Sequence, residues 1–392
     1  LTANNLTNDG QIQGDEALSL TLPVTDGKGT LINRGTLTTG GDATLFVRLM
    51  DNQGSLSSLG NTALTGTSLI NDGRVVAATG LSLRGDYQGR GLLNTAGTLT
   101  LDGDTLANNG HWESRALSLQ GKHLINQGSV LGNTVVLSLD QLTNHGDMQG
   151  INTLQLNTTG LLDNAGVISG NQSVAVTAGD VKQGGTLEGK TVTLDAASLV
   201  NQGKILGVDA LTLSIAGNLS NDGSLLTQKA GVVTAQQMNN SGLMQAGSLT
   251  LQADDIVNAG QLLGIDALSI IAQHGLTNQQ TGTLLTQGAA VLQAAQAANH
   301  GEWRADNLTL QTAHFSNTGR VQTAGDIDIT ALPERAARQR SFLPMALSLA
   351  ADIQQLNTLS PRQGDGAANG VLDNRGTLVS GGDIQLRAIQ LA

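Results

Sequence analysis

The chain of 392 residues contains no cysteine, four prolines and only 2% aromatic residues. The lack of cysteine excludes disulfides, thiol catalysis and cysteine-ligated zinc. The scarcity of aromatic rings argues against a sugar cleft, where such rings normally form the binding platforms. Long hydrophobic runs are missing as well, since no stretch approaches the roughly 18 consecutive apolar residues of a membrane span.

Positive charge is also scarce, because 20 Lys and Arg face 31 Asp and Glu, for a net charge of −11. Nucleic-acid binding is therefore not expected, since counterion release needs a basic face. The 39% hydrophobic content can still form a core, which argues against charged disorder. The sequence has no initiator Met and no leader, and it opens and closes within a repeated phrase ("LTANNLTNDG", "IQLRAIQLA"). We expect it to be a piece of a longer protein.

Glycine is abundant, with 51 residues, and much of it marks a repeat. The phrase Leu-x-Asn-x-Gly recurs, as in "LTNDG" (6–10), "LINDG" (69–73) and "LSNDG" (219–223). Its closing glycines mostly follow one another at 18 to 20 residues: Gly10, Gly35, Gly54, Gly73, Gly110, Gly128, Gly146, Gly166, Gly203, Gly223, Gly242, Gly260, Gly301, Gly319 and Gly376. A fixed period of this kind indicates a repeat architecture.

The longer intervals are explained in three ways. Degenerate glycines at Gly97, Gly185 and Gly282 fill three of them, and the interval from 319 to 376 equals three repeats of 19 residues. The long first interval is attributed to an interruption, "LPVTDGKGT" (22–30).

Between the glycines, apolar residues alternate with polar ones in short runs, as in "LVNQGKILGVDALTLSIAGN" (199–218). This period of two predicts short β-strands with one buried face. Antiparallel hairpins would give a longer, two-fold repeat, whereas one repeating unit places identical positions above one another. We predict an all-β parallel β-helix (β-solenoid) of about 19 residues per coil, with about 19 coils and a length on the order of 90 Å.

The repeated phrase is predicted to form a corner of each coil. By parity its Leu and Asn face inward and the residue after Asn faces outward, so successive asparagines can form a hydrogen-bond ladder. The glycine allows close packing or a positive φ. The predicted corner residues are Asn8, Asn33, Asn71, Asn126, Asn201, Asn221, Asn258 and Asn317, with Gly10, Gly35, Gly73, Gly128, Gly203, Gly223, Gly260 and Gly319.

No motif predicts catalysis, a cofactor, a small-molecule substrate or a metal. "GGTLEGKT" (184–191) matches the phosphate-loop pattern but runs into a strand-like "VTLDA", so we do not expect nucleotide binding. Trp112 and Trp303 follow landmark glycines at a position that is often aliphatic, which predicts core side chains. The histidines lack metal-ligand spacing and are expected in solvated turns: His111, His123, His145, His274, His300 and His314.

The predicted organisation is repeats over 1–330, an irregular excursion over 331–370 and a resumed repeat over 371–392. The excursion holds three of the four prolines and four arginines, and "MALSLAADIQQLNT" (345–358) could form a short helix. It is expected to replace or wrap about two coils. Two interpretations stay open, a tolerated insertion or a partner-contact or hinge element. The candidate contact residues are Arg335, Arg338, Arg340 and Phe342.

The Leu-x-Asn-x-Gly repeat resembles the haemagglutinin repeats of filamentous haemagglutinin and of CdiA contact-dependent growth-inhibition proteins. The resemblance implies a right-handed β-helical, monomeric filament, secreted to the surface of a Gram-negative bacterium through an outer-membrane two-partner transporter. Because no secretion domain and no Val-Glu-Asn-Asn junction is evident, it implies the filament or receptor-contacting portion, which presents a receptor-binding region to host or neighbouring cells. The alternative is a β-helical carbohydrate-active enzyme (polysaccharide lyase or glycosidase), which would need outward carboxylates clustered in a groove.

Overall fold

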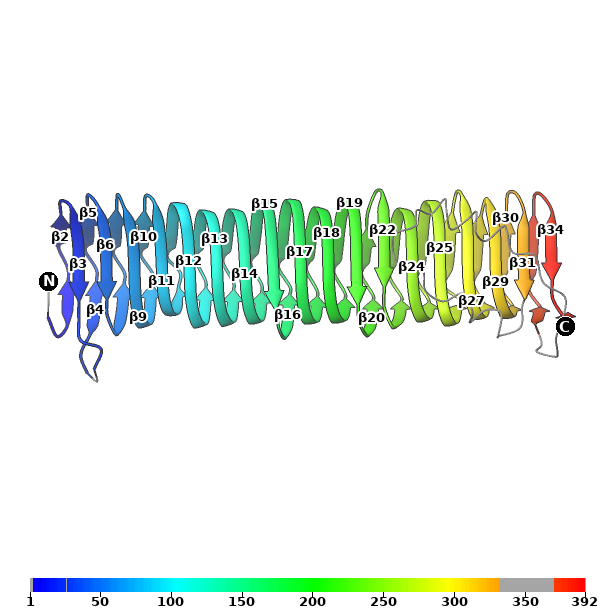
Figure 1. The fold of residues 1–392 in the computed structure, drawn as a ribbon, viewed down its shortest axis with the longest axis horizontal. Coiled ribbons are helices and arrows are strands. Elements are labelled where there is room, and N and C mark those ends of the chain that lie inside the picture. Colours follow the sequence, from blue (N-terminus) through cyan, green and yellow to red (C-terminus); the bar gives the residue numbers. More distant parts are fainter. Residues whose placement is uncertain (1–2, 26, 332–369, 392) are drawn as a thin grey trace, which may run out of the picture. The chain divides into compact units, whose positions relative to one another are not determined.

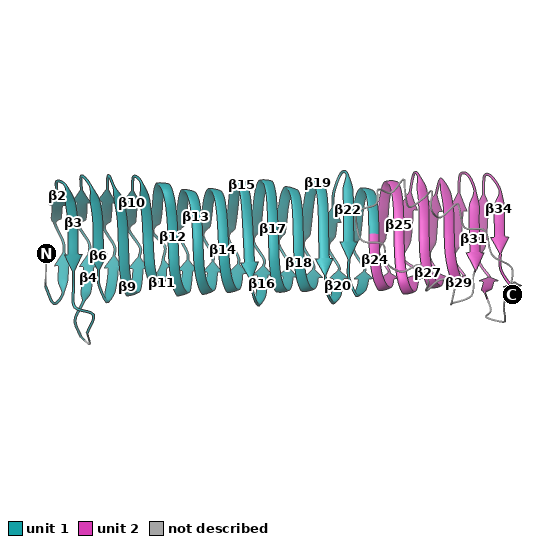
Figure 2. Ribbon diagram, viewed as in Figure 1, with its two compact units in different colours: residues 1–250 teal, residues 251–392 magenta. Residues whose placement is uncertain are grey.

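A computed structural model describes residues 3–25, 27–331 and 370–391, and all regular elements within these ranges are β-strands. The chain divides into two compact units, residues 1–250 and 251–392 (Figure 2). Within each unit the strands pair in parallel with the equivalent strands of the next coil. The predicted all-β parallel solenoid is confirmed.

The strands that begin in unit 1 are β1 (Leu6–Asn8), β2 (Gln11–Gly14), β3 (Ala17–Thr21), β4 (Thr30–Asn33), β5 (Thr36–Thr39), β6 (Asp42–Phe46), β7 (Leu49–Asn52), β8 (Ser55–Ser58), β9 (Asn61–Asn71), β10 (Arg74–Ala77), β11 (Gly80–Gly89), β12 (Leu92–Asn108), β13 (His111–Asn126), β14 (Ser129–Asn144), β15 (Asp147–Thr158), β16 (Leu161–Asn164), β17 (Val167–Gln183), β18 (Thr186–Asn201), β19 (Lys204–Ile215), β20 (Asn218–Asn221), β21 (Ser224–Leu226), β22 (Ala230–Thr234), β23 (Gln237–Asn240) and β24 (Leu243–Asn258) (Figure 1). Those that begin in unit 2 are β25 (Gln261–Asn278), β26 (Thr283–Thr286), β27 (Ala289–Asn299), β28 (Glu302–Ala305), β29 (Asn307–Asn317), β30 (Arg320–Thr323), β31 (Ile327–Ala331), β32 (Val371–Asn374), β33 (Thr377–Ser380), β34 (Ile384–Arg387) and β35 (Gln390–Leu391).

One coil consists of three strand segments. β4, β5 and β6 form such a coil, and β7, β8 and the first part of β9 lie directly over them in register, with Asn33 opposite Asn52. In many later coils the segments run together into one long bent strand, as in β13 and β14. We call the three segments of a coil its first, second and third strands, counted from the segment that ends in the repeated Asn.

The core is a set of stacked aliphatic side chains inside each coil. In the phrase at 219–223, Leu219 and Asn221 are buried and Asp222 is exposed, as the parity of the sequence predicts. Trp112 and Trp303 are also fully inside the coils. Each buried leucine contributes roughly 1.5–3 kcal/mol before entropy is counted, so stability is a collective property of the stacked coils.

The corner glycines are required by close backbone packing. A Cβ atom on Gly35 would lie 2.0 Å from the carbonyl oxygen of Gly10, and one on Gly223 would lie 2.1 Å from that of Gly203. Among the described glycines, positive φ angles occur only at Gly27, Gly29 and Gly85. Of the two reasons expected for a corner glycine, close approach is therefore the one that applies.

The prediction that Gly97 closes a degenerate copy of the repeated phrase is wrong. Gly91 is the glycine that packs on Gly73, and Gly110 packs on Gly91, whereas Gly97 lies at the next corner, against the carbonyl of Thr79. The phrase Leu-x-Asn-x-Gly is missing from this coil because Gly89 stands where most other coils have asparagine. The landmarks at Gly185 and Gly282 do occupy the predicted corner.

The interval from Gly319 to Gly376 is also not three coils. β32 pairs directly with the end of β29, with Asn374 opposite Asn317, and β33 pairs with β30. The 57 residues are one coil of 19 plus an insertion of 38, residues 332–369, which has the length of two coils, and the coils are fewer than the about 19 predicted. The possible helix at 345–358 lies outside the described residues. At the other interruption, 22–30, the expected loop separates β3 from β4.

Two adjacent glycines allow a test of close packing. An added Cβ would lie 2.0 Å from the Gly166 carbonyl oxygen at Gly185, but at Gly184 its nearest contact is at 3.8 Å. We expect Gly185→Ala to destabilise the fold by about 1–3 kcal/mol, as overpacking does, and Gly184→Ala to be neutral or slightly stabilising. Urea unfolding followed by circular dichroism measures both, and equal midpoints would contradict the proposed role of the corner glycine.

Candidate functional site

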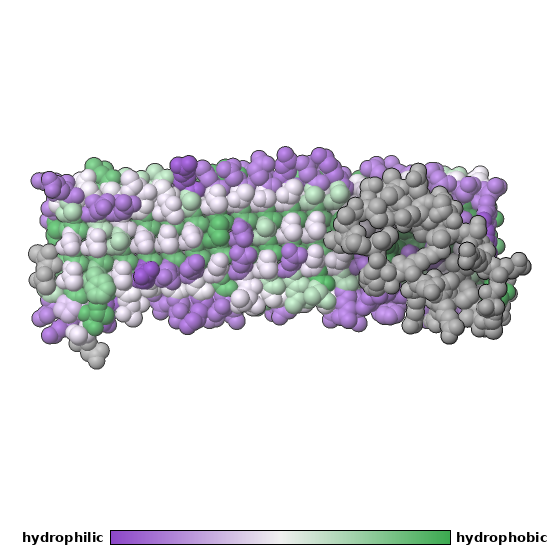
Figure 3. All heavy atoms as spheres, in the orientation of Figure 1, coloured by the Kyte–Doolittle hydropathy of each residue, from purple (hydrophilic) through white to green (hydrophobic). Residues whose placement is uncertain are grey.

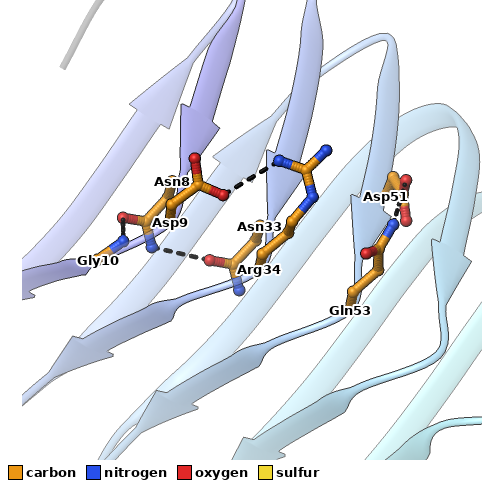
Figure 4. Close-up of polar contacts among 7 residues, drawn as sticks. All are labelled: Asn8, Asp9, Gly10, Asn33, Arg34, Asp51 and Gln53. Atoms are coloured by element: carbon orange, nitrogen blue, oxygen red, sulfur yellow. Dashed lines mark hydrogen bonds and ion pairs between the residues drawn. The ribbon is translucent and has the colours of Figure 1, made fainter.

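The most specialised polar chemistry of the structure is a column of inward-facing amides, here called the asparagine ladder. In it the side-chain Nδ2 of one corner residue donates to the side-chain oxygen of the next, as from Asn33 to Asn52 at 2.7 Å and from Asn126 to Asn144 at 2.7 Å. Figure 4 shows its beginning, where Asn8 donates to Asn33. In unit 2 the ladder runs from Asn258 through later coils to Asn317 and then directly to Asn374, at 2.7 Å.

The structure places all eight predicted asparagines in this ladder. Eight further asparagines belong to it, which the sequence reasoning did not name although their glycines were mostly among the landmarks: Asn52, Asn108, Asn144, Asn164, Asn240, Asn278, Asn299 and Asn374. Gln183 takes the same position in one coil and accepts from Asn164 at 3.0 Å.

The ladder satisfies most of the amide groups that it removes from water, although the Oδ1 of the buried Asn201 has no hydrogen-bond partner. Asn126 is fully buried, and its Nδ2 also donates to the backbone carbonyl of Asp147 in the next coil, at 3.4 Å. A buried amide without partners would cost about 1–3 kcal/mol, so the ladder strongly favours the register in which corners lie over corners. Its chemistry is structural, because all of these residues are buried except Asn374 at the end of the ladder.

Two steps of the ladder are different. At one, the Nε2 of Gln183 donates to the backbone carbonyl of Lys204 and not to Asn201. At the other, a phenol accepts in place of an amide. Gly89 replaces asparagine, and the Asn71 Nδ2 donates instead to the hydroxyl of Tyr87, at 3.4 Å. Tyr87 is buried, with its ring edge-on to Trp112 at a centroid distance of 5.4 Å. Burial raises the pKa of the Tyr87 hydroxyl above its ordinary value. A phenol therefore takes the place of a missing amide, a substitution that the sequence pattern did not reveal.

The outer surface carries exposed ion pairs. Arg34 contacts Asp9 at 3.0 Å (Figure 4), and Lys122 contacts Asp104 at 2.7 Å. The hydrogen bond from Lys229, 2.8 Å away, lowers the pKa of Asp209. Exposed pairs of this kind contribute little to stability. They link neighbouring coils along the surface.

The described residues show no arrangement typical of an enzyme. They contain no group of three or more histidine, aspartate or glutamate side chains that could hold a metal. A cavity in unit 2 is lined mainly by core side chains such as Leu268, Leu292 and Trp303, and no carboxylate lines it. The phosphate-loop match runs from the corner at Gly184 and Gly185 into strand β18, and its Lys190 lies 3.8 Å from Asp209.

The predicted partner-contact residues lie outside the described part of the chain: Arg335, Arg338, Arg340 and Phe342. The structure does define where the insertion that holds them begins and ends. It follows Ala331, at the end of a third strand, and the coil resumes at Gly370. No helix in the described ranges is long and apolar enough to cross a membrane.

Comparison with known proteins gives consistent matches. The family model described as "Haemagglutinin repeat" matches residues 1–85, 78–166, 149–223 and 346–392. The chain is 39% identical to "Deoxyribonuclease CdiA" of Dickeya dadantii over 69% of this chain and 8% of that protein. It is 30% identical to "tRNA nuclease CdiA" of Escherichia coli O6:K15:H31, over 70% of this chain and 11% of that protein.

The chain spans about a tenth of the length of the curated relatives that it matches. "Toxin CdiA" of Escherichia coli, 29% identical over 76% of this chain, is matched over 10% of its own length. No solved structure matches the chain.

Removing one amide from the ladder should be costly. In Asn126→Ala, the Nδ2 of Asn108 loses its acceptor, now 2.8 Å away, and the oxygen of Asn144 loses its donor. We expect a loss of about 2–4 kcal/mol, from two unsatisfied buried groups. Asn109→Ala, at an exposed neighbouring position, is the control and should change the free energy of unfolding little. Similar denaturation midpoints for the two variants would contradict the role of the ladder.

Tyr87 should make the fold sensitive to alkali. Because its pKa is raised in the fold, the unfolded chain ionises first, near pH 10, and stability falls as the pH rises above that value. Tyr87 is the only tyrosine of the chain, so phenolate absorbance reports it alone. We expect this absorbance to appear only with unfolding, and Tyr87→Phe to lose less stability above pH 10 than the wild type. Phenolate formation near pH 10 in the folded protein would contradict this prediction.

Proposed function

The chain belongs to the haemagglutinin-repeat family, and on this basis we propose that it is a filament segment of a large, secreted contact-dependent inhibition protein. Its role in that protein is to form a stiff scaffold that presents a receptor-binding region to host or neighbouring bacterial cells. We assign it no catalytic role of its own. The nuclease names of the relatives belong to proteins of which the aligned part is about a tenth.

The observation that carries this proposal is the use that the structure makes of its polar side chains. The buried amides of the ladder serve the stacking of coils, and exposed ion pairs such as Arg34 with Asp9 and Lys122 with Asp104 join neighbouring coils. A coil that repeats without a cleft suits a spacer. The 38-residue insertion between Ala331 and Gly370 is the largest departure from the repeat, and recognition residues are disproportionately found in such segments on rigid scaffolds.

The proposed partners follow from the family. Export takes place through an outer-membrane two-partner transporter, and the segment then acts at the surface of a Gram-negative bacterium. The target is a receptor on another cell, contacted by Arg335, Arg338, Arg340 and Phe342 within the insertion. A glycosidase or lyase receives no support, because no carboxylate lines the cavity of unit 2.

Deleting residues 332–369 tests this assignment. The register places Ala331 opposite Thr312 and Val371 opposite His314, so joining Ala331 to Gly370 restores the one-residue link of the preceding coil. We expect circular dichroism and thermal unfolding to stay unchanged while binding to target cells falls by about tenfold or more. If the deleted protein stays folded and binds as before, the insertion is not the contact region.

A charge-reversal pair gives a matched control. Arg335→Glu, Arg338→Glu and Arg340→Glu together should reduce binding. The same change of charge at three exposed arginines of unit 1, Arg74→Glu, Arg90→Glu and Arg115→Glu, should leave it unchanged. Equal losses for the two triple variants would indicate that net charge, rather than the insertion, determines binding.

A further inference from the structure

The asparagine ladder is interrupted inside unit 1, between Gln183 and Asn201. Strand pairing places these two residues opposite each other, as it does Asn164 and Gln183. Gln183 accepts a hydrogen bond from Asn164 at 3.0 Å, but its own Nε2 donates to the backbone carbonyl of Lys204 at 3.4 Å. The side-chain oxygen of Asn201, a fully buried residue, therefore has no partner in the protein. The ladder residues before and after this step form two separate hydrogen-bonded rows.

Rotating one of the two side-chain amides by half a turn does not repair the step. If the amide of Asn201 turned over, it would lose the bond that its Nδ2 donates to Asn221 at 2.7 Å. If the amide of Gln183 turned over, its oxygen would no longer accept from Asn164. Because each amide offers its donor and its acceptor on opposite sides, the rows on both sides fix the direction of donation.

The first amide of another row shows how such an oxygen can be satisfied. Asn108 is the first amide after the phenol step, and its side-chain oxygen accepts the backbone N–H of Gly110 at 3.0 Å. The equivalent N–H beside Asn201 is already used, because Gly203 donates to the carbonyl of Gln183 at 2.9 Å. Asn201 is the only ladder residue in the described ranges with a buried side-chain atom that lacks a partner.

The surroundings of this step do not replace the missing bond. Gly184 and Gly185 are consecutive, whereas at the other corners of unit 1 a residue with a side chain precedes the landmark glycine. A glycine pair gains the most conformational freedom when it is released from a packed corner. Lys204 contacts Glu188 across the same two coils at 3.5 Å, but both side chains are exposed, and exposed pairs contribute little.

The step is a feature of the interior. Figure 3 shows unit 1 from outside, as rows of residues of similar hydropathy that run along the coils. Gln183 is only 2% exposed and does not contribute to this surface. The difference between this coil and its neighbours therefore lies in how the coils are held together inside.

The missing bond makes one coil interface easier to open than its neighbours. Opening an ordinary step of the ladder breaks a buried bond between two amides, as between Asn126 and Asn144. At the Gln183 step no such bond is broken, and the oxygen of Asn201 gains a hydrogen bond to water. An unsatisfied buried acceptor of this kind favours opening by a factor of roughly ten. Because each coil of a solenoid contacts only its neighbours, the weakest interface opens first.

We propose that the interface between the coils of Gln183 and Asn201 is a joint, at which the stack of unit 1 opens locally before the interfaces around it. The joint separates the row from Asn108 to Gln183 from the row that begins at Asn201. In a stiff scaffold such a joint confines opening to one position and leaves the coils on both sides closed. The proposal concerns the stacking of coils and does not depend on the role of the insertion.

Residue-resolved hydrogen exchange of the full chain under native conditions tests the joint. The N–H of Gly203 donates to the carbonyl of Gln183 at 2.9 Å, so its exchange reports opening of the joint. The N–H of Gly146 donates to the carbonyl of Asn126 at 3.1 Å, across an interface whose ladder bond is intact. After correction for the intrinsic rates of the two amides, we expect Gly203 to exchange about tenfold faster than Gly146.

A single substitution should close the joint. Gln183→Asn gives this coil the same residue as the coils on both sides and allows the ladder to continue to Asn201. We expect exchange at Gly203 to become about tenfold slower, while exchange at Gly146 stays the same. The control is Gln127→Asn, the same change at an exposed corner position, which should alter neither rate.

Two results would overturn the proposal. One is equal exchange at Gly203 and Gly146 in the wild type, a comparison that needs no variant to fold. The other is a folded Gln183→Asn variant in which Gly203 exchanges as fast as in the wild type, or in which both amides slow equally. The first would show that the step is not weaker than its neighbours, and the second that the missing amide bond is not the cause.

Discussion

The approach of one backbone to the next at the glycine corners is the constraint on which the rest of the structure depends. At Gly223 the peptide of one coil lies so close to Gly203 that no side chain fits, and its N–H donates to the Asn201 carbonyl at 3.0 Å. This contact fixes the coil spacing at that of paired strands. It also places the amide of Asn221 2.7 Å from that of Asn201, so that the ladder follows from the corner.

The same constraint gives the polar groups inside the coils a different role from those on the outer surface. Groups that could act as ligands inside the coils are used for stacking, and the outside repeats with the coil. New recognition can then arise where a coil is interrupted or where a whole face changes its character. The insertion between Ala331 and Gly370 is a case of the first.

Much of the fold could be predicted from the sequence, because the repeat period of a parallel solenoid and the alternation of its inward and outward residues are both visible in the sequence. Leu219 and Asn221 face inward as alternation requires. The predictions failed at two places. Gly97 lies off the period and at another corner, whereas Gly91 keeps the period and packs on Gly73. The 57 residues from Gly319 to Gly376 equal three periods but hold one coil, because the 38-residue insertion has the length of two coils. The place of Tyr87 in the ladder could not be predicted, since it depends on which residues the register brings together across coils.

Hydrogen exchange at the corner amides tests the central claim most directly. The N–H groups of Gly128 and Gly223 donate to the carbonyls of Asn108 and Asn201 in the preceding coils, at 3.1 and 3.0 Å. If the repeated phrase is a corner of a stacked coil, these amides exchange as slowly as those of the flanking strands. Exchange as fast as in an unstructured chain would show that the phrase forms solvent-exposed turns, and would contradict the account.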